Sequence, residues 1–156
     1  MNIIHIITTI NRGGAENQLI QNLLTQNSKG LNVSVIFLKG NGYWKKYLIK
    51  KGIKVYGPFF NKFYYFNING ILKIFRLVNK KDIVLHCHMP PSLLITYFCS
   101  FLNRKKKLIY TSHNDEPFLP FKLVDFFLTN FLLKNVDLII CITSTVKKYL
   151  IKRYKL

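Results

Sequence analysis

Short runs of apolar, often β-branched residues alternate along the chain with longer segments in which apolar residues recur three and four positions apart. The short runs have the length and composition of strands, and the longer segments have the period of helices that bury one face. Strands are predicted at residues 3–8, 33–38, 53–56, 82–87, 107–112 and 137–142. Helices are predicted at residues 14–28, 68–79, 91–102, 119–134 and 144–154.

Strands and helices that alternate in this way are typical of a parallel sheet covered by helices. Residues 108–110 and 138–142, within the fifth and sixth predicted strands, are almost continuously apolar, which indicates strands covered on both faces and therefore central in the sheet. Segment 56–66 is aromatic without a clear period and is predicted to be a long loop. The pattern as a whole predicts an α/β fold: a Rossmann-like, three-layer α/β/α domain with a mainly parallel, doubly wound sheet of about six strands.

A chain of 156 residues has room for one compact domain, here 1–156. A hydrophobic content of 49% argues against disorder. The spacing of Cys87, Cys99 and Cys141 fits neither a disulfide framework nor a metal site, and the start of the chain lacks the pattern of a secretory signal. We therefore expect a cytoplasmic protein, with peripheral attachment to the inner face of the cytoplasmic membrane as a further option.

The charge is strongly positive, because 24 Lys and Arg stand against 6 Asp and Glu, a net charge of +18. Two interpretations stay open: a lysine-rich background composition, or a partner such as an anionic membrane or a nucleic acid. Arginine is scarce, and no basic helix alternates with base-stacking aromatic residues, so we expect no nucleic acid.

Basic clusters near aromatic residues are the candidate membrane contacts. They comprise Lys45, Lys46, Lys50, Lys51, Arg104, Lys105, Lys106 and Lys107. Segment 119–134 is apolar around most of its circumference, which indicates a helix that is packed on several sides or one that faces a membrane. Core packing is the favoured interpretation of that helix.

Paired glycines, Gly13 and Gly14, follow the first predicted strand and precede a helix. Backbone amides at such a turn can approach a ligand closely, and the helix N-terminus favours phosphate. The segment lacks a third glycine and a Gly-Lys-Ser/Thr sequence, so it is neither the dinucleotide fingerprint nor a Walker loop. Taken alone, the two glycines are a weak signal, and a simple tight turn is the favoured interpretation.

Two histidines, His86 and His88, end the fourth predicted strand, and strand alternation places both on one face with Cys87 on the other. A zinc site would need further ligands, for which His113, Asp115 and Glu116 are the candidates. Histidines that hydrogen-bond backbone and substrate are the favoured alternative, so no metal and no cofactor is predicted.

The segment after the fifth predicted strand holds His113 and then Asn114, Asp115 and Glu116, which include two of the six carboxylates of the chain. In a doubly wound sheet with the strand order 3-2-1-4-5-6, the carboxyl ends of strands one, four and five are neighbours at the switch point. We therefore expect Gly13, Gly14, His88 and His113 to meet at one crevice.

Four segments of this chain resemble segments of glycosyltransferase family 4, the retaining enzymes of the GT-B fold, and they occur in the same order as in that family. Residues 3–16, with their Gly-Gly-Ala-Glu turn, are similar to the start of that family, and residues 82–88 resemble its fourth strand, which ends in His-x-His. Residues 111–113 resemble its fifth strand, and residues 137–144 resemble its sixth. The resemblance implies two Rossmann-like domains, of which this chain would be the first, acceptor-side domain.

The resemblance also implies a role for each matching residue. Arg12, Gly13 and Gly14 would form the loop at the donor diphosphate, and His113 would position the transferred sugar and the acceptor. The acceptor side would comprise Glu16, His88, Asn114, Asp115 and Glu116. The implied partners are a nucleotide sugar and a glycan or lipid-linked acceptor, in surface polysaccharide or lipopolysaccharide biosynthesis.

The sequence stops at Leu156, before any segment similar to the donor-binding domain of that family. We therefore expect no sugar transfer by this chain alone, and a separate chain that supplies the second half is one option. The alternative is a stand-alone module that binds an anionic membrane through its basic, aromatic surface.

Overall fold

A computed structural model of the chain describes residues 2–60, 67–100, 106–114, 117 and 121–156. Its strands form a single six-stranded sheet. They are β1 Asn2–Ile7, β2 Asn32–Phe37, β3 Lys54–Tyr56, β4 Ile83–His88, β5 Lys107–Ser112 and β6 Leu138–Cys141. No strand end differs from its predicted position by more than one residue.

Helices follow the strands in alternation. They are α1 Gly14–Ser28, α2 Lys45–Lys50, α3 Ile68–Val78, α4 Pro90–Ser100, α5 Lys122–Lys134 and α6 Ser144–Tyr154. All of them were predicted except α2, which has 6 residues and buries only Leu48. A helix this short does not show a helical period in the sequence.

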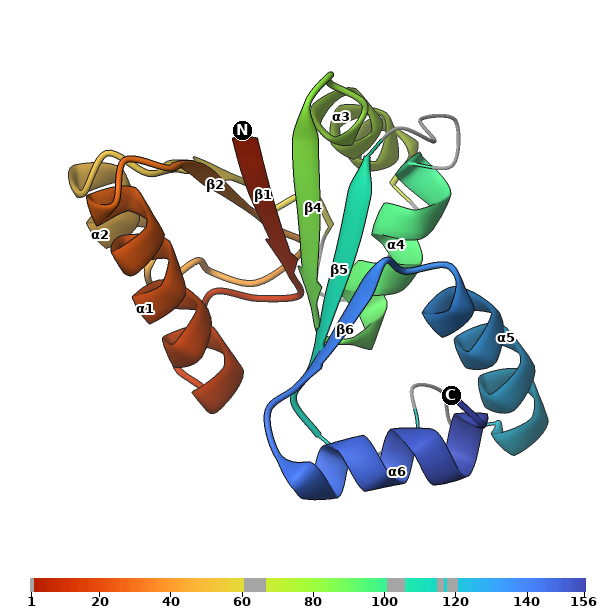
Figure 1. Ribbon diagram of the computed structural model, residues 1–156. Coiled ribbons are helices and arrows are strands. Elements are labelled where there is room, and N and C mark those ends of the chain that lie inside the picture. Colours follow the sequence, from red (N-terminus) through yellow and green to blue (C-terminus); the bar gives the residue numbers. More distant parts are fainter. Residues whose placement is uncertain (1, 61–66, 101–105, 115–116, 118–120) are drawn as a thin grey trace.

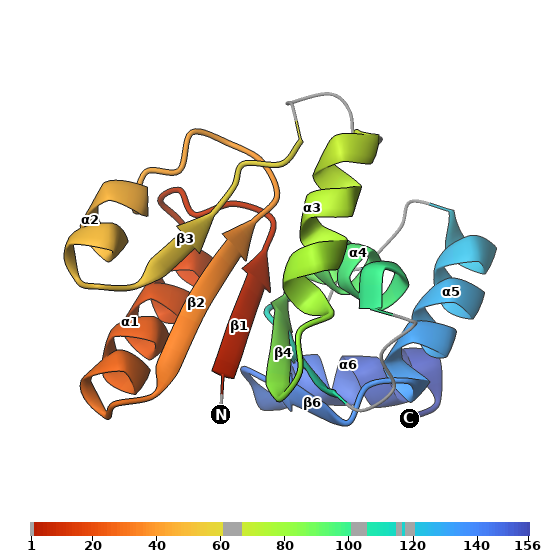
Figure 2. The same ribbon diagram turned by 90° about the horizontal axis from the view of Figure 1, so that it is seen from above.

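Every pair of neighbouring strands is parallel, and the strand order is β3-β2-β1-β4-β5-β6. The predicted doubly wound sheet is therefore confirmed. Helices α1 and α2 cover one face of this sheet, and α3 and α4 cover the other (Figures 1 and 2). The order reverses between β1 and β4, which is where folds of this kind bind ligands, outside the carboxyl ends of the strands.

Alternation along β1 divides the core into two parts. Ile4 and Ile6 pack with residues of α3, α4, α5 and α6, whereas Ile3 and Ile7 pack with residues of α1 and α2. His5 lies between Ile4 and Ile6 in sequence and therefore points to the α1 face of the sheet. It is fully buried there.

The prediction that segment 137–142 is a central strand was wrong. β6 is the last strand in the sheet order, and on one of its faces Leu138 is 51% and Ile140 38% exposed. In the register with β5, Leu138 pairs with Ile109, and no described helix covers that end of the α1 face. Continuous apolar residues here mark an edge strand with an uncovered face.

The interpretation of segment 119–134 as a helix packed on several sides was also wrong. Its buried residues are Asp125, Thr129, Leu132 and Leu133. The opposite face is exposed and apolar, with Leu123, Val124, Phe127 and Phe131 at its surface. No helix in the described part of the chain is both long enough and apolar enough to cross a membrane.

Candidate functional site

The turn between β1 and α1 brings Thr9, Gly13 and Glu16 together. Gly13 caps α1 with an extended backbone, and a methyl group added to it would collide with the Glu16 carboxylate. Glu16 Oε1 accepts a hydrogen bond of 2.5 Å from Thr9 Oγ1, so a shift of the carboxylate away from such a methyl group would disturb this hydrogen bond. Open space surrounds the Cα of Gly14 instead. Glycine at position 13 therefore serves the close approach of Glu16, which the tight-turn interpretation did not anticipate.

The first turn of α1 also has an electrostatic role. The amides at a helix N-terminus carry partial positive charge and lack partners within the helix. Glu16 lies in this first turn, where a carboxylate is favourable. Arg12, predicted to line the same loop, is exposed: its Nη2 donates a 2.5 Å hydrogen bond to the Tyr43 hydroxyl, and the guanidinium carbon lies 4.4 Å from the centre of that ring.

Histidines on three neighbouring strands form one cluster on the α1 face. His5 pairs with His86 in the parallel register of β1 and β4, and His88 lies two residues further on the same face. The centres of the His86 and His88 rings are 4.3 Å apart, and those of His5 and His86 are 4.9 Å apart. His113 follows β5, 5.6 Å from His88 between ring centres. All 4 histidines of the chain belong to this cluster.

Hydrogen bonds connect three of these rings in a row that begins on α1. Gln26 Oε1 lies 2.8 Å from His5 Nε2, and His5 Nδ1 lies 3.1 Å from His88 Nε2. His88 Nδ1 in turn lies 3.3 Å from His113 Nε2. We call these residues, Gln26, His5, His88 and His113, the histidine relay. His86 stands beside it, with Nε2 2.7 Å from the Thr111 hydroxyl.

Burial keeps these rings uncharged. It lowers the pKa of His5 from 6.5 to about 4 and, with the nearby His5 and His113, the pKa of His86 to about 3. The pKa of His88 is also well below its usual value, mainly through burial. The pKa of His113 is lowered by burial, while the charge of Glu16 acts in the opposite direction. Glu16 and His113 therefore lie within electrostatic reach of each other at the carboxyl edge of the sheet.

Neutral imidazoles can also bind metal ions. The ligand nitrogens of His5, His86 and His88 lie within 4.8 Å of one another. The third histidine of this group is His5, which the sequence analysis did not consider as a ligand. Of the ligands that it did consider, Asp115 and Glu116 lie outside the described residues.

The structure thus brings Gly13, Glu16, His88 and His113 to one edge of the sheet. Asn114 follows His113 and is half-buried, with its carbonyl oxygen 3.3 Å from the Ser112 hydroxyl that donates to it. His5 is the member of the site that sequence analysis missed. The sequence does contain a signal for His5. The predicted strand order places strands one and four side by side, and the alternation of side chains along each strand can then put His5 on the same face as His86 and His88.

A hollow of about 480 Å³ opens next to this edge, at the carboxyl ends of β1, β2 and β3. Its lining residues are Thr9, Asn11, Lys39, Gly40, Asn41, Pro58 and Phe60. Gly40 has a φ of +95° and passes close to the Asn11 side chain, so this lining depends on glycine. Sequence analysis did not select these residues because loop positions after strands show no periodic signal.

The predicted basic contact residues do not form a single patch. Lys45, Lys46, Lys50 and Lys51 lie on or directly after α2, whereas Lys107 begins β5, three strands away from β2 in the sheet. Lys106 donates hydrogen bonds to the Ser100 carbonyl and to Asn79, and Lys107 pairs with Asp137. Arg104 and Lys105 lie outside the described residues.

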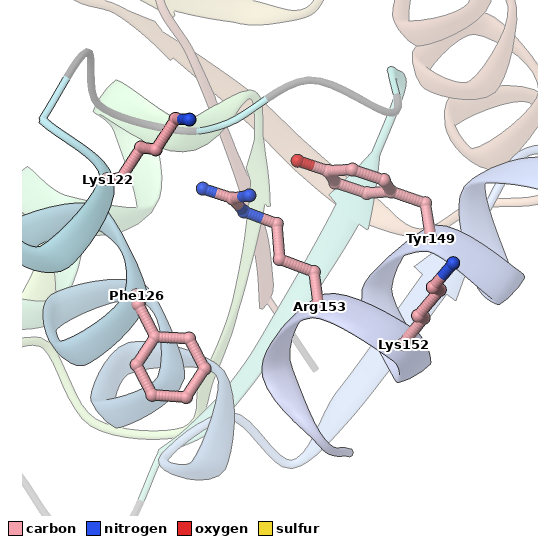
Figure 3. A pocket seen from close by; sticks show the side chains of 5 residues that line it. All are labelled: Lys122, Phe126, Tyr149, Lys152 and Arg153. Carbon is pink, nitrogen blue, oxygen red and sulfur yellow. The ribbon is translucent and has the colours of Figure 1, made fainter.

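A second hollow, of about 500 Å³, lies between α5 and α6 (Figure 3). It is lined by Lys122, Phe126, Tyr149, Lys152 and Arg153. Beneath it, buried Asp125 accepts hydrogen bonds from Arg153 Nη2 at 2.8 Å and from the Tyr154 hydroxyl at 2.9 Å. Arg153, which lines the hollow, is therefore tied to a buried carboxylate, and the lining as a whole is cationic.

Solved structures with the same fold include complexes with UDP and with UDP-glucose. HepE of Anabaena, in complex with UDP, matches with a TM-score of 0.77 and 19% identity, over 100% of this chain and 42% of that one. HepE with UDP-glucose matches with a TM-score of 0.76 and 19% identity over the same shares. A glycosyltransferase from Rickettsia africae matches with a TM-score of 0.72 and 20% identity, over 99% of this chain and 40% of that one.

The chain therefore spans about 42% of the length of HepE, to which it is similar. A search of curated proteins found no match. The sequence profile of Glycosyltransferase Family 4 matches residues 12–156, which is nearly the whole chain. Together with the parallel sheet of order 3-2-1-4-5-6, this match shows that the chain belongs to Glycosyltransferase Family 4.

Proposed function

We propose that this chain is the acceptor-binding half of a retaining glycosyltransferase that moves a sugar from a nucleotide sugar to a glycan or lipid-linked acceptor. Family membership supports sugar transfer, and a relative of the same fold binds UDP-glucose. The chain spans 42% of that relative. We therefore assign the nucleotide site mainly to a second, carboxyl-terminal half, and expect the chain alone to be inactive.

The observation that carries this proposal is the meeting of Gly13, Glu16 and His113 at the switch point of the sheet. The free amides of α1 and its positive end favour the diphosphate of a donor. Glu16 and the neutral ring of His113 accept hydrogen bonds from sugar hydroxyls. The chemistry of the site is orientation of the two substrates and stabilisation of the departing diphosphate.

The acceptor occupies the space beside His113 in this proposal. Asn114 is assigned to one side of it, and the family resemblance assigns Asp115 and Glu116, which lie outside the described residues, to the same side. The hollow of about 480 Å³ lies next to this edge of the sheet. That volume is within the usual range for sites of small ligands. Assembly of a surface polysaccharide or lipopolysaccharide is the setting we propose for such an acceptor.

Co-expression tests whether the nucleotide site belongs to a second, carboxyl-terminal half. The chain is produced alone and together with a carboxyl-terminal Rossmann-like half supplied as a separate chain, and release of nucleoside diphosphate from UDP-glucose and other nucleotide sugars is measured. We expect release only from the pair, and its loss in the pair that carries His113→Ala. Turnover by the chain alone would contradict the proposal.

The exposed face of α5 favours a second candidate function, docking to an anionic membrane. Leu123, Val124, Phe127 and Phe131 form an apolar surface. Three cations, Lys122, Lys152 and Arg153, line the hollow between α5 and α6 (Figure 3). An apolar face flanked by lysines is the combination that interfacial helices use, and the net charge of +18 adds long-range attraction.

Co-sedimentation with liposomes tests this second candidate. Binding to vesicles with anionic lipid should exceed binding to neutral vesicles and should weaken as salt is raised. Phe127→Ser with Phe131→Ser should reduce binding, whereas Lys29→Ser with Lys54→Ser, two exposed lysines outside the candidate contacts, provides a control for charge elsewhere. Equal binding to anionic and neutral vesicles would overturn the docking function.

A further inference from the structure

The histidine relay is a hydrogen-bonded chain with a fixed direction. A neutral imidazole has one N–H and one lone pair, so each ring in a row must donate on one side and accept on the other. Gln26 presents its Oε1 to His5, and a carbonyl oxygen only accepts. His5 therefore donates from Nε2, which leaves its Nδ1 as an acceptor.

The same reasoning passes along the row. His5 Nδ1 accepts from His88 Nε2 at 3.1 Å, so the lone pair of His88 is on Nδ1. His88 Nδ1 accepts from His113 Nε2 at 3.3 Å. The proton of His113 is then on Nε2 and its lone pair on Nδ1. The side-chain amide of Gln26 on α1 thus determines which ring nitrogen of His113, beyond the end of β5, carries the proton.

Burial makes this order persistent. His5 and His88 are 0% and 1% exposed, so water does not compete for their ring nitrogens. A protonated ring would have two N–H groups and would interrupt the row. Burial lowers the pKa of both rings far below neutral pH, so the row stays neutral.

We propose that His5 and His88 are positioning residues which, together with Gln26, hold His113 in a single tautomer with the proton on Nε2 and the lone pair on Nδ1. An acceptor nitrogen is the partner that a sugar hydroxyl needs for donation. The role of His113 toward a sugar rests on the proposed function. The tautomer does not, because it follows from the relay alone.

A metal ion on the same histidines is the competing arrangement. It would need lone pairs of His5, His86 and His88 to converge, and it would have to break the hydrogen bond between His5 and His88. His86 is engaged by Thr111 and is not part of the relay. The hydrogen bonds between the rings therefore favour the relay over the ion.

Long-range ¹H–¹⁵N spectra of the imidazoles, recorded on the whole ¹⁵N-labelled chain without ligand at pH 7.5, test the proposal. We expect His5, His88 and His113 all to carry the proton on Nε2. Gln26→Met removes the acceptor at the far end of the relay and keeps the length of the side chain. It should reduce the ratio of the two tautomers of His113 about fivefold, the effect of one hydrogen bond.

Matched variants separate this coupling from a general disturbance of the fold. Gln26→Glu retains an acceptor oxygen and should retain the tautomer of His113. Gln21→Met, on the exposed side of the same helix, should leave it unchanged. A proton on Nδ1 of His113 in the parent chain, or a ratio that Gln26→Met does not alter, would overturn the proposal.

Addition of Co²⁺ to the same sample tests whether the histidines bind a metal ion instead of forming the relay. A 1:1 visible absorption spectrum that disappears in His86→Gln would replace the relay by a metal site and overturn the proposal, whereas no spectrum supports the relay. If the tautomer is as expected and no sugar transfer is ever detected, the proposed function fails and the relay stands.

Discussion

Glu16 accepts a short hydrogen bond from the Thr9 hydroxyl across the turn that joins the first strand to the first helix. This contact places a carboxylate at the helix N-terminus, above the glycine at position 13 and within electrostatic reach of His113. Three parts of the candidate site therefore depend on the position of one side chain. Variants of this side chain and of the glycines test that dependence.

Replacement of Glu16 by glutamine should lower the pKa of His113. The carboxylate charge currently opposes the effect of burial, and the amide of glutamine can still accept from Thr9 while it removes the charge. The pKa is measured by NMR titration of the His113 ring. Asp82→Asn removes an exposed carboxylate at the amino end of β4 and is the control. An unchanged or higher pKa of His113 in Glu16→Gln would contradict the geometry described.

Gly13→Ala and Gly14→Ala should change the free energy of unfolding in opposite directions, although the two residues are adjacent. A methyl at position 13 displaces the Glu16 carboxylate, and we expect it to destabilise the fold by about 1 kcal/mol. A methyl at position 14 enters open space in the first turn of α1, where alanine is the better helix former, so we expect a gain of up to about 0.5 kcal/mol. Urea unfolding measures both. Equal free energies of unfolding for the two variants would argue against the close approach of Glu16.

Strand positions could be predicted from the sequence because parallel strands need β-branched, apolar residues, and the histidines could be assigned to one face because side chains alternate. The edge position of β6 could not be predicted from the sequence. Leu138 and Ile140 are apolar, as in a covered strand, although no described helix covers them. His5 was missed because it is a single polar residue in an apolar run. Its importance comes from its register with His86, which is a tertiary relationship.

The stability of the fold should fall between pH 6.5 and pH 5. The folded-state pKa of His5 is about 4 and that of His86 about 3, against 6.5 for the free side chain. Below pH 6.5 the unfolded chain therefore binds protons that the folded chain excludes, and the free energy of unfolding decreases as the pH falls. By pH 5 we expect a loss on the order of 2 kcal/mol for each ring.

Urea unfolding at several pH values between 7.5 and 5 measures this loss. His86→Gln should retain only the part that comes from the remaining rings, so its curve should be less steep. A free energy of unfolding that stays constant or rises toward pH 5 would show that these rings are not buried as neutral groups.

Asp125→Asn should destabilise the fold strongly. The carboxylate has 0% exposure and accepts hydrogen bonds from Arg153 and Tyr154, which would lose a charged partner. Breaking a buried pair of this kind costs about 3 kcal/mol. Lys107→Ala, which removes the 71% exposed partner of a surface pair with Asp137, should change the free energy of unfolding by less than about 0.5 kcal/mol. Thermal or urea unfolding compares the two, and similar costs would contradict the difference in burial.

Titration of the ¹⁵N-labelled chain with acceptor glycans is the most direct test of the proposed acceptor site at the carboxyl edge of the sheet. Glycans selected on an array are added to the chain, and backbone and imidazole signals are followed by NMR. The account predicts saturable shifts at Glu16, His113 and Asn114, with affinity about tenfold weaker in His113→Ala. Saturable binding that instead shifts Lys122, Tyr149 and Lys152, and that His113→Ala does not weaken, would contradict it.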